Sequence, residues 1–183
     1  MAAHGFICFD TAIGECALAW GDHGLAGVLL PESRRGENRA RLARKFPDAV
    51  EAAPPTQIAA AVTAITALLR GEPADLSAIL LDLTRACDFE RRVYAIVRAI
   101  PPGQTLTYGE IAARLGDPLE ARAVGQAMGK NPFPIVVPCH RVLGAGGKLG
   151  GFSAPGGAGT KLRMLAIEGA LSPGALPLFA ERG

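Results

Sequence analysis

The chain has 183 residues, of which 49% are hydrophobic and 20% charged, and its formal net charge is +2. This composition supports one large packed domain or two small ones. No apolar run is long enough to cross a bilayer and the first residues lack a signal-peptide pattern, so we expect a cytoplasmic protein without membrane association. Four irregularly spaced cysteines argue against a secreted disulfide framework.

Charge is distributed unevenly along the chain. Residues 1–83 carry seven Lys or Arg against ten Asp or Glu, whereas residues 84–183 carry twelve against seven. A basic surface is the electrostatic footprint of nucleic-acid binding, although ordinary solvated charge gives the same composition. We predict two domains, 1–83 and 84–183, and only the second suits a polyanion.

The N-terminal half alternates short apolar runs with turn residues. Runs at 6–9, 16–20 and 25–30 predict a small antiparallel sheet. Helical spacing follows at 36–46 and at 55–70, where Gly71 stands at the position that often ends a helix. One more strand is predicted at 79–83. This half is expected to be structural, because none of its residues forms a recognisable catalytic motif.

Histidine and cysteine are zinc ligands, and the first 23 residues hold four of them. Their spacing fits no zinc knuckle, and residues on alternating strands more often point into the core than at a shared ion. We therefore expect no bound metal and no cofactor. The four residues are His4, Cys8, Cys16 and His23.

A helix-turn-helix pattern occupies the first part of the C-terminal half. Asp88 can cap a preceding helix at 89–100. The Thr-x-x-Glu run at 107–110 is a capping box that opens a short helix, and a turn joins it to a second helix at 119–130. Such pairs are often plain structural hairpins, but some bind DNA. Arg122, among small residues on the second helix, is the side chain best placed to probe a duplex.

A proline-rich segment at 131–142 presents Cys139. Three prolines restrict its backbone, and the β-branched run at 135–137 is predicted to form a short buried strand behind the cysteine. His140 and Arg141 follow at once, and a thiol becomes a good nucleophile when a base or positive neighbours favour the thiolate. A free cysteine is also commonly a small buried apolar residue, so the motif alone leaves both interpretations open.

Glycines dominate the segment that follows. A hairpin turn is predicted at 144–147, an edge strand at 148–153 and a closing helix at 160–168, which Gly169 ends. The spacing matches neither a Walker nor a Rossmann phosphate loop. The predicted fold class is therefore α/β of the α+β kind: a small N-terminal antiparallel sheet with helices, then a mostly helical domain that holds the helix-turn-helix and the cysteine.

Together these motifs resemble the O6-alkylguanine-DNA alkyltransferases, also called methylated-DNA–protein-cysteine methyltransferases. The resemblance covers roughly residues 88–170, and the N-terminal half matches only in general character. It rests on TYGEIA at 107–112, ARAVG at 121–125, NP at 131–132, PCHRV at 138–142, Lys161 and Glu168, in the order that the family shares.

The resemblance implies direct, irreversible repair of O6-alkylguanine in duplex DNA, with O4-alkylthymine left open as a second substrate. Cys139 would accept the alkyl group by in-line attack, once per protein molecule, while His140, oriented by Glu168, takes the thiol proton through a water molecule. No cofactor takes part. The protein is expected to act as a monomer on double-stranded DNA.

The resemblance also assigns roles around this centre. Tyr108 would donate to the guanine ring and help to rotate the nucleotide, and Arg122 would fill the gap that the flipped base leaves. The recognition helix would enter the minor groove, where the small residues Ala123 and Gly125 permit close approach. Structural roles are implied for Asn131, which ties the active-site turn to the helix-turn-helix, and for Arg141 and Pro138.

The substrate pocket is where this chain departs from the family. Family members commonly have a tyrosine in the loop that covers the base, and this chain has Phe152, followed by Ser153. The departure affects the shape of the pocket more than the chemistry. We predict that Val142 and Leu149 complete its wall. The zinc ligands of some relatives do not align with histidines or cysteines here.

Two other functions would use the same residues. A cysteine hydrolase or amidotransferase would employ Cys139, His140 and Glu168, but it needs an oxyanion hole, which is not evident here, and it turns over. A DNA-binding sensor or regulator would recognise alkylated bases without repairing them. Its relatives lack the acceptor cysteine, whereas Cys139 is present.

Overall fold

The computed structural model describes residues 3–149 and 156–170. Its N-terminal half is built on a sheet of the order β3-β2-β1-β4. Three strands are antiparallel, as the alternating apolar runs predict: β1 (Gly5–Thr11), β2 (Gly14–Gly21) and β3 (Gly24–Leu29). The fourth, β4 (Val50–Glu51), pairs in parallel with β1. It has no counterpart among the predicted strands, because two residues are too few to show an alternating pattern.

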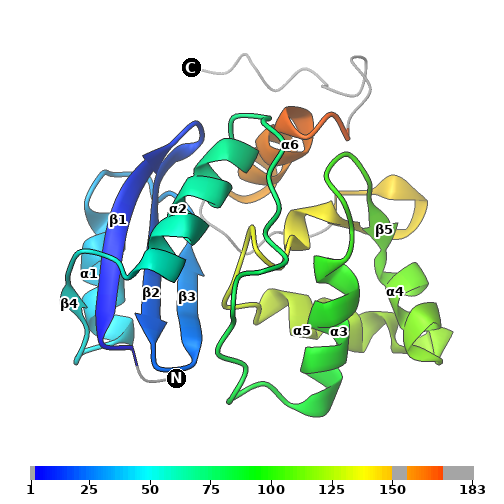
Figure 1. The fold of residues 1–183 in the computed structure, drawn as a ribbon. Helices are drawn as coiled ribbons and strands as arrows, with labels where there is room; N and C mark the ends of the chain where they lie inside the picture. The colour runs from blue at the N-terminus through cyan, green and yellow to red at the C-terminus, as the bar shows by residue number, and fades with distance from the viewer. Residues whose placement is uncertain (1–2, 150–155, 171–183) are drawn as a thin grey trace.

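Two helices cover the sheet on opposite faces (Figure 1). They are α1 (Glu37–Lys45) and α2 (Thr56–Leu68), both at predicted positions. On β2, Leu18 belongs to the apolar cluster on the α2 side, whereas Ala17 and Ala19 belong to the cluster that contains Leu42 of α1. Coverage of both faces explains why 16–20 is a continuous apolar run rather than an alternating one.

The predicted strand at 79–83 is wrong. This segment makes a single parallel bridge, between Leu25 and Leu81. The pairing ends at Asp82, whose carboxylate turns back to accept from the backbone and hydroxyl of Thr84. Arg98 holds the residues before the bridge in an irregular path, because its Nη2 donates to three backbone carbonyls. These belong to Leu76, Ser77 and Ile79.

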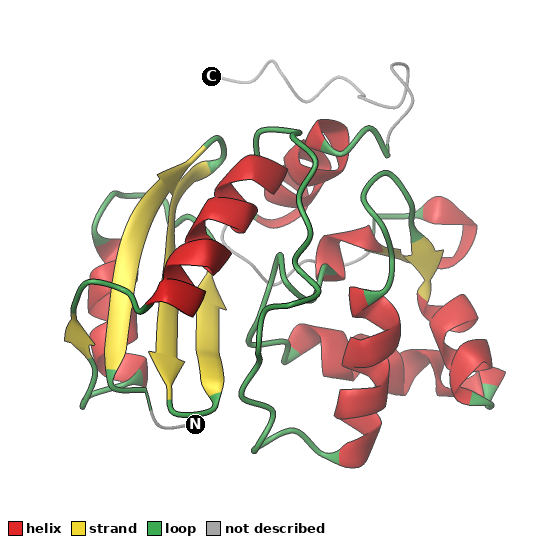
Figure 2. Cartoon of the chain, in the orientation of Figure 1, coloured by secondary structure: helices red, strands yellow, loops and turns green. Residues whose placement is uncertain are grey.

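The C-terminal half is mostly helical (Figure 2). Its helices are α3 (Asp88–Arg98), α4 (Tyr108–Leu115), η1 (Pro118–Glu120), α5 (Ala121–Gly129) and α6 (Gly157–Ile167). The capping box is confirmed, with Glu110 N–H donating to Thr107 Oγ1 at 3.2 Å. Asp88 is not the cap of α3; Cys87 is, and its N–H donates to Glu90 Oε2 at 3.1 Å. Among the described residues, no helix is long and apolar enough to cross a membrane.

The predicted strand at 135–137 is also wrong, although all three residues are buried. Val137 N–H donates to Phe133 O at 2.8 Å, which closes a turn, and Ile135 has a φ of 76°. The turn uses the N–H of Val137, and the positive φ of Ile135 lies outside the β region, so the run does not pair as a strand. A turn therefore leads directly to the cysteine.

A two-residue strand follows the cysteine and pairs with another that comes earlier in the chain. Strand β6 (Val142–Leu143) pairs in parallel with β5 (Leu106–Thr107), which directly precedes α4. The predicted turn at 144–147 is present and contains η3 (Ala145–Gly147). The predicted edge strand at 148–153 lies largely outside the described residues, and its first two residues form no strand.

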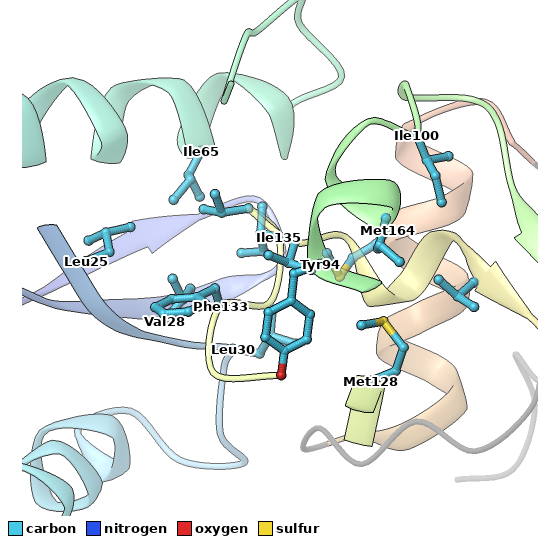
Figure 3. Close-up of a cluster of buried hydrophobic side chains, with 14 of the residues drawn as sticks. Leu25, Val28, Leu30, Ile65, Tyr94, Ile100, Met128, Phe133, Ile135 and Met164 are labelled. Atoms are coloured by element: carbon cyan, nitrogen blue, oxygen red, sulfur yellow. The ribbon is translucent and has the colours of Figure 1, made fainter. Parts of the chain in front are cut away.

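One hydrophobic cluster contains residues from both halves of the chain (Figure 3). Leu25 and Ile65 lie in it on the sheet side, and Tyr94 and Met164 on the helical side. Backbone bonds reinforce the contact, since Val28 N–H in β3 donates to the carbonyl of Pro132 at 2.9 Å. The sheet thus supports the segment that presents the cysteine. The domain boundary near residue 83 stays a prediction.

Candidate active site

Residues from two separate parts of the chain meet beside Cys139. The short helix η2 (Cys139–Arg141) follows Pro138, and Glu168 lies at the end of α6. His140 Nε2 lies 2.9 Å from Glu168 Oε1, and both side chains are buried. Arg141 donates from Nε and Nη2 to the two carboxylate oxygens of Glu168 at 2.8 and 2.7 Å. The carboxylate therefore holds both the histidine and the arginine.

The charges of this cluster fix the tautomer of His140. Burial opposes the ionisation of Glu168, but its hydrogen bonds with His140 and Arg141 outweigh that effect and lower its pKa to about 2. Burial lowers the pKa of His140, so its ring is neutral near pH 7. Since Nε2 must donate to the carboxylate, Nδ1 keeps its lone pair. Among the described residues Nδ1 has no hydrogen-bond partner, and it is free to accept a proton.

Cys139 is half-buried, and burial raises the pKa of its thiol. The Asn131 side chain, the positive charge of Lys161 and two backbone amides act in the opposite direction without overcoming burial. The resting thiol is therefore protonated at neutral pH. A base is needed when it reacts, and Nδ1 of the adjacent residue His140 is suited to that role.

Lys161 is a buried cation in the same site. Its Nζ donates to the carbonyls of Val142 and Leu149, each at 2.6 Å, and burial lowers its pKa to about 8. It thus joins α6 to the strand after the cysteine and to the end of the next loop. The resemblance includes Lys161 as a motif residue but assigns no contacts to it. A sequence signal does exist, because Lys161 and Leu165 are one turn apart on the buried side of the helix.

Asn131 connects the active-site turn with the end of α5. Its Nδ2 donates to the carbonyl of Val137 at 2.8 Å, and its Oδ1 accepts the N–H of Phe133 at 2.9 Å. Arg141 is nearly buried and also donates from Nη1 to the carbonyl of Ile100. Both side chains therefore fix the backbone on either side of Cys139.

The helix-turn-helix places Tyr108 and α5 next to each other. Tyr108 is the first residue of α4 and is half-buried; a Cβ added at Gly125 would lie 3.9 Å from its ring. Burial raises the pKa of Tyr108, which keeps its hydroxyl protonated and able to donate. On α5, Arg122 is exposed and Ala123 is partly buried. Phe152 and Ser153 lie outside the described residues.

Neither a metal cluster nor a disulfide occurs in the described part of the chain. No three His, Cys, Asp or Glu side chains in residues 3–149 and 156–170 are grouped so that they could hold a metal ion. All four cysteines are unpaired: Cys16 is buried, Cys8 and Cys139 are half-buried, and Cys87 is exposed.

Comparisons with known proteins give a consistent result. Residues 88–170 match the family model described as 6-O-methylguanine DNA methyltransferase, DNA binding domain. The chain is 49% identical over 125 residues to the methylated-DNA–protein-cysteine methyltransferase of Mycolicibacterium paratuberculosis, covering 68% of this chain and 73% of that protein. It is 45% identical over 170 residues to the protein of that name from Mycobacterium tuberculosis, covering 93% and 95%.

A solved structure extends the similarity to the fold. The crystal structure of Mycobacterium tuberculosis OGT in complex with DNA superposes with a TM-score of 0.72 and 36% sequence identity, over 94% of this chain and 97% of that one. The similarity therefore includes the N-terminal sheet as well as the helical half.

Proposed function

The chain belongs to the family of methylated-DNA–protein-cysteine methyltransferases, and from this membership we infer that it repairs O6-alkylguanine in duplex DNA by moving the alkyl group irreversibly onto Cys139. One observation carries the assignment of the acceptor. Cys139 stands on a fixed turn directly before a buried, neutral His140, whose Nε2 is bonded to Glu168. This is the arrangement of an activated nucleophile.

The transfer then proceeds in one displacement. Nδ1 of His140 takes the thiol proton through a water molecule, and the sulfur attacks the alkyl carbon in line with its bond to O6. The S–C bond forms while the C–O6 bond breaks, and the electron pair stays on guanine. The Tyr108 hydroxyl stabilises the departing base by donating a hydrogen bond to its ring. A thioether is a poor leaving group, so each molecule reacts once.

Access to the alkyl group requires the nucleotide to leave the stack. The exposed Arg122 on α5 is placed to occupy the gap that remains. Ala123 has only a methyl group and Gly125 has no side chain, so α5 can approach the floor of the minor groove closely. Because the minor groove carries little sequence information, this mode suits a protein that must act at any damaged guanine.

We expect Arg122→Ala to slow repair of a duplex roughly tenfold or more, and to change the reaction with free O6-methylguanine base less than about twofold. Only the duplex requires extrusion of the base. Single-turnover rates with the two substrates measure the difference. Arg114→Ala is the matched control, because this exposed arginine lies in the last turn of α4 and not on α5. Equal losses on both substrates would remove Arg122 from this role.

The Tyr108→Phe protein should transfer the methyl group about tenfold more slowly while its affinity for the duplex changes little, since one hydrogen bond to the leaving base is lost. The phenyl ring preserves the contact with Gly125. Rates at saturating protein and dissociation constants from titration separate the two effects. A defect confined to affinity would contradict the assignment.

The proposal places the protein in the cytoplasm as a monomer. Four unpaired thiols support a reducing compartment, where a nucleophilic cysteine stays available. Sedimentation of the protein without DNA tests whether it is a monomer, and a mass of two chains would contradict this.

A synthetic duplex with one O6-methylguanine tests the function as a whole. We expect the lesion to revert to guanine in proportion to the protein added, and the reaction to stop when the protein is used up. Repeated turnover would point instead to a hydrolase that uses the same Cys139. Tight binding of the lesion without its loss would point to an alkylation sensor.

A further inference from the structure

Leu119 is the most exposed large hydrophobic residue of the part of the chain that the structure describes. Its side chain is 90% exposed, against 64% for Val50 and 62% for Leu80. An isolated leucine at a surface is ordinary in itself. What distinguishes Leu119 is its position in η1, at the turn between the two helices of the helix-turn-helix.

The backbone around Leu119 is fixed. Asp117 caps η1, with its Oδ1 accepting the N–H of Leu119 at 2.9 Å and its carbonyl accepting the N–H of Glu120 at 3.1 Å. Pro118 restricts φ between them. The backbone that carries the leucine is therefore held in one place on the surface, so little backbone freedom is lost when the side chain is covered.

The spacing of Leu119 and Arg122 along the chain favours the same face of the helix-turn-helix for both. Arg122 comes three positions after Leu119, across the end of a 3₁₀ turn and the start of α5, and residues at this spacing lie over one another in helical backbone. Both side chains are exposed. We therefore expect a duplex that Arg122 enters to lie close to Leu119.

We propose that Leu119 is a second minor-groove contact, packing against the deoxyribose faces next to the point where Arg122 enters the stack. The inference rests on the proposed function and adds a residue to its DNA-binding surface. Asp117 and Glu120 lie close to Leu119 in the chain, and residues 115–121 contain no Lys or Arg, so Leu119 has no cation among its immediate neighbours in sequence to bind a phosphate. The sugar walls of the groove are apolar and uncharged, and minor-groove proteins use apolar side chains against them. Leu119 thus contributes to DNA affinity through an apolar contact, without binding a phosphate.

The contact has a signature that distinguishes it from an electrostatic one. Phosphate contacts release counterions and make affinity fall with salt, whereas burial of an apolar side chain releases none. We expect Leu119→Ala to raise the dissociation constant for unmodified duplex about fivefold at every salt concentration from about 50 to 200 mM, as partial burial of a leucine implies. The slope of log Kd against log salt should not change.

Three further variants complete the experiment. Leu119→Met keeps the apolar contact and should bind within about twofold of the wild type. Leu80→Ala removes a leucine that is also exposed but lies near the end of the N-terminal half, and it should bind as the wild type does. Arg122→Ala removes the neighbouring contact and should also weaken binding of the duplex.

Normal duplex affinity of Leu119→Ala would overturn the proposal, and so would a changed salt slope. Loss of affinity only on long duplexes that hold several molecules, with normal binding on a short duplex, would show that Leu119 contacts a neighbouring copy of the chain instead. The wild-type protein separates these outcomes from failure of the proposed function, because its own repair of a methylated duplex does not depend on Leu119 being a contact.

Discussion

The Cys139→Ala protein is expected to transfer no alkyl group and still to bind duplex DNA as tightly as the wild type. Its turn does not depend on the thiol, because Cys139 N–H donates to the carbonyl of Val137 at 2.8 Å and Pro138 restricts the backbone before it. Arg122 and the rest of α5 are untouched by the change. Transfer from a labelled methylated duplex and binding to an unmodified one measure the two properties separately.

Cys87→Ala is the matched control for this experiment. Cys87 is an exposed thiol at the start of α3 and should be dispensable for transfer. Its protein is expected to react at the wild-type rate, with a small loss of stability from the altered helix cap. Residual transfer by Cys139→Ala, or a loss of transfer in Cys87→Ala, would mean that Cys139 is not the acceptor.

Glu168→Gln should damage both reactivity and stability. The negative charge of Glu168 fixes the tautomer of His140 and neutralises the nearly buried Arg141. Without it the base loses its orientation, and we expect transfer to slow by about a hundredfold or more. A buried arginine that loses its counter-charge also costs roughly 3 kcal/mol in the free energy of unfolding.

The pH dependence of stability gives an independent check of the same residue. The pKa of Glu168 is lowered from its ordinary 4.5 to about 2, so the unfolded chain binds more protons in this range. The stabilisation is complete above pH 4.5 and is lost as the pH falls towards 2. In Glu168→Gln this part of the pH dependence should disappear. Urea unfolding across that pH range measures it.

Glu72→Gln serves as the control, because Glu72 is exposed on the turn after α2. It should show the wild-type decline in stability between pH 4.5 and 2 and the wild-type rate of transfer. If Glu168→Gln showed that same decline, the carboxylate would not be coupled to His140 and Arg141 as the structure indicates.

The sheet and helices were predictable because local patterns determine them. The capping box at 107–110 satisfies the first N–H groups of α4 by itself. The two false strands, at 79–83 and 135–137, are apolar runs whose composition suits a strand. Strand pairing requires a partner strand and free N–H groups. The sequence of an apolar run does not show whether either is available. The buried residues 135–137 show that hydrophobicity reports burial more reliably than conformation.

The site was predictable to different degrees. His140 adjoins Cys139 in the chain, so local sequence alone suggests the pair. Glu168 lies 28 residues from His140, and only the family resemblance brings it to the site. The burial of Lys161 has a signal in the helical spacing, but its two contacts could not be foreseen, because the carbonyl acceptors lie elsewhere in the chain.

Mass spectrometry of the chain after incubation with excess duplex containing O6-methylguanine shows whether Cys139 is the acceptor. We expect every molecule to gain a single methyl group on the peptide containing Cys139, and an equal amount of guanine to be restored in the DNA. Lesions consumed while the Cys139 thiol stays unmodified would contradict this assignment, as would a methyl group found on Cys8, Cys16 or Cys87 instead.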